Sequence, residues 1–157
     1  MDVDGHVKTR DRTLKVNIPK GIKDKQQIRL SGQGSAGIGG ADAGDLYLEV
    51  SFKPHALYRV EVKDLYFDLP LAPWEAALGA KVKVPTPSGT IEVKIPKGSI
   101  SGNKLRLKGK GIPGSLAGDL YAVLRITLPP ADSEKAEAIY RKMESELSFN
   151  PRAGLGI

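Results

Sequence analysis

The chain has 157 residues, 40% of them hydrophobic, and a formal net charge of +6, so it can build the core of one ordinary domain or two small ones. It contains no cysteine, which excludes disulfides, thiol catalysis and cysteine-ligated zinc or iron–sulfur sites and fits a reducing cytoplasm. No apolar run reaches the roughly 18 residues of a membrane span, and no signal peptide pattern opens the chain, so we expect neither membrane association nor export.

Two stretches of the chain have closely related sequences. Residues 14–34 align without a gap with residues 91–111, and nine of the 21 aligned positions are identical. Each stretch then reaches the tetrapeptide Gly-Asp-Leu-Tyr, at 44–47 and at 118–121. Two copies at this long period predict two related domains in tandem rather than a solenoid. We place the first domain at 1–54, the second at 55–130 and a C-terminal segment at 131–157.

The predicted strands follow from alternation of apolar and polar residues. Residues 14–18 alternate in this way and stop at a Pro-Lys-Gly turn, and residues 65–71 alternate next. Residues 91–95 repeat the first pattern and form a predicted hairpin with residues 105–107, and a long strand at 120–128 closes the second copy. The fold class is therefore mostly β, with two tandem, homologous, small sandwich-like or barrel-like domains.

Helix is predicted at two places. Pro73 and the following Trp-Glu-Ala-Ala-Leu, stopped by Gly79, are typical of a short helix with proline in its first turn. The long helix comes last, at about 133–147, where Asp132 or Ser133 can cap its start. Its apolar residues Ala136, Ile139, Tyr140, Met143 and Leu147 share one face.

A local excess of positive charge falls on residues 91–111. Six basic residues oppose a single acid, Glu92, and are candidates for binding DNA phosphates or an acidic peptide tail: Lys94, Lys97, Lys104, Arg106, Lys108 and Lys110. The alternative is a solvated strand face, because lysine and arginine alternate there with apolar residues and lysines protect sheet edges from pairing.

Nothing in the sequence predicts an enzyme, a metal site or a cofactor. The glycines at 32, 34 and 37 and at 109, 111 and 114 match the dinucleotide-binding pattern G-x-G-x-x-G, but no helix is predicted to open at the last glycine. We interpret them as glycines of hairpin loops. The two histidines have no partner in sequence, and no carboxylate pair has a spacing that catalysis requires.

The repeated motifs, the segment Lys53-Pro-His-Ala-Leu-Tyr58, residues 64–80 and the tail Phe149-Asn-Pro-Arg152 together resemble the C-terminal substrate-binding region of DnaJ-type co-chaperones. The similarity covers about residues 12 to 152 and is greatest to the zinc-free class and its bacterial curved-DNA-binding branch. It implies two β-rich domains, a client-binding groove on the first domain and a C-terminal helix that forms a homodimer.

This resemblance implies roles for particular residues. Tyr58 takes the position of the junction aromatic beside the groove, with Leu57 next to it; the alternative is a packing pair between the domains. Dimerisation is expected through Ile139, Tyr140, Met143, Leu147 and Phe149. The chain departs from the family at Lys25 and Val62, where glycine is usual and where we expect strained or rebuilt turns, and at Ala56, where proline is common.

The resemblance also implies partners. We expect a non-enzymatic protein that binds apolar segments of unfolded clients for transfer to a seventy-kilodalton heat-shock chaperone. The alternative is non-specific or curved-DNA binding, with a place at the nucleoid. The sequence has no helical domain with a His-Pro-Asp tripeptide, so stimulation of that chaperone's ATPase is not implied for this chain alone.

The repeat predicts that the first domain is incomplete. Subtracting the offset of 77 residues from 65–71 places the first copy's equivalent strand before Met1. We therefore expect a piece of a longer protein whose groove-bearing first domain is truncated. The alternative is that residues 1–13 form a shorter substitute.

Overall fold

The computed structural model describes residues 11–114 and 117–156. Their order is β1 (Gln27–Leu30), β2 (Leu46–Glu49), β3 (Arg59–Glu61), β4 (Asp64–Leu71), α1 (Pro73–Leu78), β5 (Ala80–Thr86), β6 (Gly89–Ile95), β7 (Lys104–Leu107), β8 (Leu120–Ile126), α2 (Glu134–Glu146) and a 3-10 turn (Ala153–Leu155). The fold is mostly β, as predicted. None of the helices in these ranges has the length and apolar character needed to cross a membrane.

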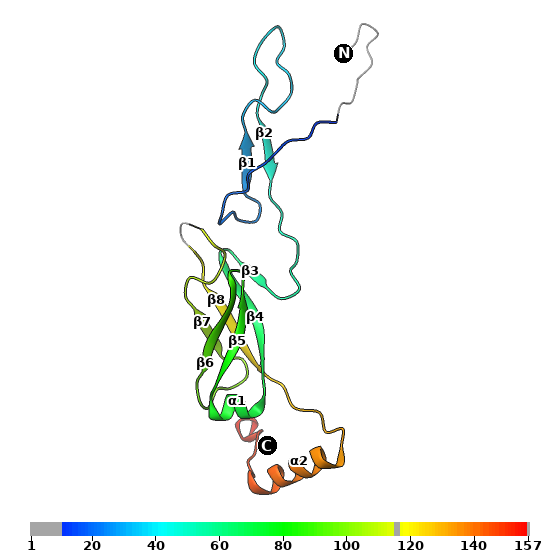
Figure 1. Cartoon of the computed structure of the whole chain (residues 1–157), viewed down its shortest axis with the longest axis vertical. Helices are drawn as coiled ribbons and strands as arrows, with labels where there is room; N and C mark the ends of the chain where they lie inside the picture. The colour runs from blue at the N-terminus through cyan, green and yellow to red at the C-terminus, as the bar shows by residue number, and fades with distance from the viewer. Residues whose placement is uncertain (1–10, 115–116, 157) are drawn as a thin grey trace. The chain divides into compact units, whose positions relative to one another are not determined.

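Three sheets contain the strands. β1 pairs with β2, β5 pairs with β6, and the third sheet has four strands in the order β3-β4-β8-β7. In the first sheet Arg29 lies opposite Tyr47, and in the third Arg59 lies opposite Tyr66. The two helices are predicted correctly, and Figure 1 shows α1 at the end of β4, where the chain turns into β5.

The core confirms the alternation predicted for β4 and β8. Every second residue of β4 is buried, with Phe67 and Leu71 each 1% exposed. In β8, Leu120 and Ala122 are completely buried. The strand ends at Ile126, two residues before the predicted end, and Leu128 is 65% exposed.

The predicted hairpin between residues 91–95 and 105–107 is wrong. β6 pairs with β5, and β7 pairs with β8 in another sheet. The reason is the tight turn between β5 and β6, where the Thr86 hydroxyl donates to the Gly89 carbonyl at 2.6 Å and accepts from the Ser88 amide at 3.3 Å. Because this tight turn folds β6 directly back onto β5, β6 is already paired with β5 and does not pair with β7.

The predicted strand at residues 14–18 is not formed in the structure. Leu14 and Val16 are half-buried, as the alternation implies, but Ile18 is 70% exposed. The equivalent strand of the second copy, β6, pairs with β5, whose counterparts are residues 3–9 by the 77-residue offset. Those positions, and most of the substitute segment 1–13, lie outside the described residues.

The chain divides into two compact units that do not follow the repeat. One runs up to Phe67 and includes Thr86–Gly89 and Arg106–Ala122. The other contains Asp68–Pro85, Thr90–Leu105 and Val123 onward. The domain limits placed at residues 54 and 130 from the sequence stay a prediction.

Candidate functional site

Each copy of the repeat has the same arginine–aspartate brace. Asp119 accepts from the Gly109 amide at 2.8 Å and from Arg106 Nε at 2.6 Å. In the first copy Asp45 accepts from the Gly32 amide at 3.0 Å and from Arg29 Nε at 2.5 Å. The backbone bond and the arginine both lower the pKa of each aspartate. The repeated Arg-Leu-x-Gly and Gly-Asp-Leu-Tyr motifs are therefore explained by a contact that closes a loop.

The glycines of these loops are required by close backbone contacts. A Cβ on Gly34 or on Gly111 would lie 2.6 Å from the carbonyl oxygen of Asp45 or Asp119. Each glycine amide also donates to the carbonyl of the glycine that precedes that aspartate, at 2.7 and 2.9 Å. In the part of the chain that the structure describes, no helix follows Gly37, and residues 117–119 beyond Gly114 are not helical. These loops thus lack the helix that dinucleotide binding requires.

Tyr58 lies just before the edge strand β3 of the four-stranded sheet. Its ring is edge-on to Phe67, with centroids 6.0 Å apart, and tilted against His55 at 5.1 Å. Burial raises the pKa of its phenol. Leu57 beside it is 38% exposed, and Val60 within β3 is 41% exposed. Apolar side chains therefore remain accessible along a sheet edge.

His55 has a structural role that the sequence did not reveal. Its Nδ1 accepts from the Leu57 amide at 3.1 Å and from the Tyr58 amide at 3.3 Å. The imidazole therefore closes the turn that presents Tyr58 and Leu57. The adjacent pair Pro54-His55 was the available signal, because proline followed by a short polar acceptor is typical of a turn.

The six predicted basic residues lie on β6, on β7 and in the loops that follow these strands. Arg106 is held by Asp119, with its Nη2 2.6 Å from Oδ2. Lys104 lies on β7, and Lys108 and Lys110 follow that strand. Lys97 lines one recess with Lys104 and another with Lys94.

The recess shared by Lys94 and Lys97 lies where α1 and β6 end and where β5 begins, and it has a volume of about 790 Å³. Lys81 joins Lys94 and Lys97 in its lining, and Leu78 is its large exposed apolar residue. Sequence reasoning missed Lys81, because only the position of β5 beside β6 brings it to this recess.

The C-terminal helix α2 keeps its apolar face accessible. Ser133 caps it by accepting from the Ala136 amide at 3.2 Å, and the Tyr140 hydroxyl donates to the Pro129 carbonyl. Ile139, Met143, Leu147 and Phe149 are 59%, 43%, 64% and 79% exposed.

An apolar cavity of about 280 Å³ lies beside this face of α2. Ile139, Tyr140 and Met143 line it together with Pro73 and Trp74 of α1. Trp74 was not among the predicted interface residues. The sequence feature that could have indicated it is the position of the chain's one tryptophan in a helix of six residues, which is too short to bury so large a side chain.

Comparison with known proteins identifies the family. The DnaJ C terminal domain matches residues 2–129. Curved DNA-binding proteins of Coxiella burnetii and Pseudomonas putida are each 48% identical to the chain, over 151 and 143 residues. These matches cover 96% and 90% of the chain but 48% and 45% of the relatives, so the chain spans about half their length. Neither name denotes an enzyme. This chain belongs to the DnaJ C-terminal domain family.

Proposed function

We propose that the chain binds exposed apolar segments of unfolded polypeptides at the edge strand β3. The observation that carries this proposal is the apolar surface along that edge, formed by Leu57, Val60 and half-buried Tyr58. Exposed sheet edges accept extended peptides through main-chain hydrogen bonds, which tolerate many sequences, while side-chain contacts supply a preference. Such a surface suits clients that share only exposed apolar residues.

Tyr58 is the anchor of this surface. Its ring is fixed by Phe67 on one side and by the His55 turn on the other, so little side-chain entropy remains to be lost on binding. A rigid aromatic side chain beside accessible aliphatic ones is typical of residues that dominate binding energy. We infer that the bound segment would then pass to a seventy-kilodalton heat-shock chaperone, with contact to that chaperone made by a co-chaperone's helical domain with a His-Pro-Asp tripeptide.

Suppression of aggregation tests this proposal. We expect the chain to slow light scattering by a heat-denatured client enzyme only weakly, and Tyr58→Ala to remove most of that activity. Tyr47→Ala is the matched control, because Tyr47 is also an accessible tyrosine, 56% exposed, but lies on β2 in another sheet. Equal suppression by wild type and Tyr58→Ala would remove Tyr58 from the site.

A second candidate function is non-specific DNA binding. The relatives' printed name supports it, and so does the recess that brings Lys81 together with Lys94 and Lys97. Phosphate contacts release counterions, so this affinity would fall steeply with salt, whereas apolar client contacts would not weaken. A salt titration of both affinities separates the two functions. Both candidate functions, client binding and DNA binding, fit a location in the cytoplasm or at the nucleoid.

We further propose that the chain is a homodimer joined through α2. Its side chains Ile139, Met143, Leu147 and Phe149 are accessible on one chain and need a partner. Full burial of each large apolar side chain contributes about 1.5 to 3 kcal/mol before the cost of association is subtracted. A two-fold interface is the commonest way in which such a surface is covered.

A further inference from the structure

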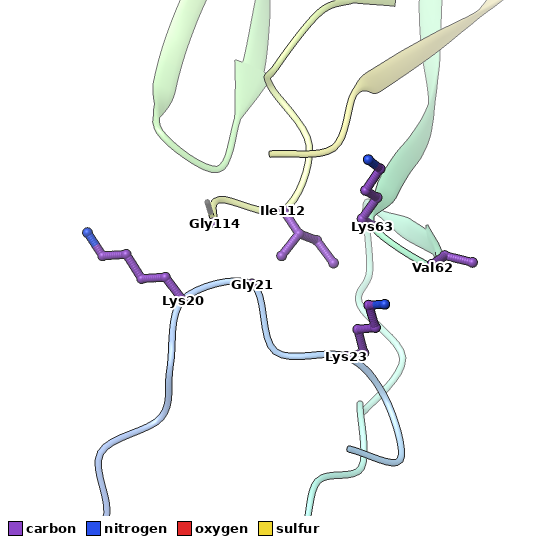
Figure 2. Close-up of a pocket in the computed structure, with 7 residues that line it drawn as sticks. All are labelled: Lys20, Gly21, Lys23, Val62, Lys63, Ile112 and Gly114. Carbon is purple, nitrogen blue, oxygen red and sulfur yellow. The ribbon is translucent and has the colours of Figure 1, made fainter. Parts of the chain in front are cut away.

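A second lysine cluster surrounds a cavity that neither proposed function uses. The cavity has a volume of about 340 Å³, and its lining includes Lys20, Lys23, Lys63, Val62 and Ile112. Figure 2 shows Ile112 at the centre, pointing toward the segment from Gly21 to Lys23, with Lys20 on one side and Lys23 and Lys63 on the other. All of these residues belong to one compact unit. The arrangement is an apolar centre with cations at its rim.

The walls of the cavity are held by backbone contacts. The Ile112 amide donates to the Lys63 carbonyl at 3.1 Å, and a Cβ on Gly118 would lie 1.8 Å from that same oxygen. On the opposite side, a Cβ on Gly21 would lie 3.2 Å from the Cα of Gly114. A side chain at either glycine would therefore come too close to the neighbouring backbone. Backbone contacts therefore bring residues 63 and 112, and residues 21 and 114, close together at two places around the cavity.

Val62 lies in the two-residue turn between β3 and β4, beside the cavity. Its φ is 59°, a left-handed conformation that is unfavourable for a β-branched residue. Two-residue hairpin turns require a positive φ at such positions, so the hairpin between β3 and β4 explains this conformation. Val62 is also 71% exposed, so the strain is not compensated by burial of its own side chain.

The charges define what the cavity can bind. Among the described residues, no carboxylate lies within ion-pair distance of Lys20, Lys23 or Lys63. Three uncompensated ammonium groups attract an anion, and an apolar group that leaves water to pack on Ile112 adds a favourable contribution. A volume near 340 Å³ is at the small end of ligand sites and suits a side chain rather than a duplex. DNA phosphates would meet the lysines but would bring no apolar group to Ile112.

We propose that this cavity binds an acidic polypeptide segment that places one large apolar side chain on Ile112 and its carboxylates on the three lysines. This site recognises acidic sequence, whereas the β3 edge recognises apolar sequence of any charge. The proposal does not rest on client binding at Tyr58.

Fluorescence anisotropy with labelled peptides tests this proposal on the full chain. The probe is Glu-Asp-Phe-Glu-Asp-amide with fluorescein at its N-terminus. One labelled control peptide has serine in place of phenylalanine, and another has lysine in place of each acid. The triple variant Lys20→Gln/Lys23→Gln/Lys63→Gln should weaken the probe about tenfold, as expected when three partly exposed ion pairs are lost. Both control peptides should bind at least that much more weakly to wild type.

The matched control is Lys81→Gln/Lys94→Gln/Lys97→Gln, which removes the same charge from the recess beside α1. It should leave probe affinity within twofold, as should Tyr58→Ala. Equal losses in both triple variants would show attraction to net charge only and would overturn the proposal. No binding by wild type, or displacement of the probe by duplex DNA at equal phosphate concentration, would also overturn it. Ile112→Ala tests the apolar contact separately and should weaken the probe but not the serine control peptide.

Discussion

Replacing Val62 by glycine should stabilise the protein. Val62 has a φ of 59°, and non-glycine residues in the left-handed region cost about 1 to 3 kcal/mol, with β-branched residues near the upper end. Glycine relieves this strain but raises the backbone entropy of the unfolded chain by about 0.5 to 1 kcal/mol. Because Val62 is 71% exposed, losing its side chain forfeits only about 0.5 kcal/mol of burial. The net expectation is a gain of about 1 kcal/mol.

Thermal unfolding followed by circular dichroism measures this gain. For a chain of this size, about 1 kcal/mol raises Tm by roughly 2 to 4 °C. Val60→Gly is the matched control, because Val60 lies in strand β3 and glycine there only weakens the strand. Lys25→Gly should give a smaller gain, since Lys25 is unbranched, has a φ of 63° and loses an exposed contact with Glu49. If Val62→Gly lowers Tm as much as Val60→Gly does, the strain argument fails.

Three further predictions concern charge and assembly. Because hydrogen bonding holds the pKa of Asp119 below its usual 3.8, its stabilisation is complete above about pH 4 and is lost as pH falls through the lowered value. Asp119→Asn should therefore lower Tm at pH 7, and the difference from wild type should shrink as the pH is lowered below about 4; a constant difference would contradict this. The variant Lys81→Glu/Lys94→Glu/Lys97→Glu should no longer shift DNA in a gel mobility assay. An unchanged shift would show that the recess does not bind DNA. Light scattering at tens of micromolar should show a dimer that Met143→Glu/Leu147→Glu converts to a folded monomer; a monomeric wild type would defeat the dimer.

The elements that local pattern determines were predictable from the sequence. Alternation located β4 and β8, proline and glycine located α1, and a serine cap with an apolar stripe located α2. The repeat also predicted backbone conformation at one position, because Lys25 aligns with Gly102 and both have positive φ.

Strand pairing could not be predicted in the same way. Residues 91–95 and 105–107 show the same alternation of apolar and polar residues. The turn at Thr86 makes β6 pair with β5, and the sequence of neither strand alone indicates which strand its partner is. The site residues missed from the sequence share this cause. Lys81 and Trp74 reach their sites only through elements that are brought together by pairing and packing.

Amide hydrogen exchange with a permanently unfolded client tests the central proposal most directly. Reduced, carboxymethylated α-lactalbumin is a suitable client, and the chain alone is the reference. Binding along the edge of β3 predicts slower exchange for residues 57–62, where a bound strand would accept hydrogen bonds, and no such slowing in Tyr58→Ala. Client binding without protection of residues 57–62 would place the site elsewhere and would contradict the account.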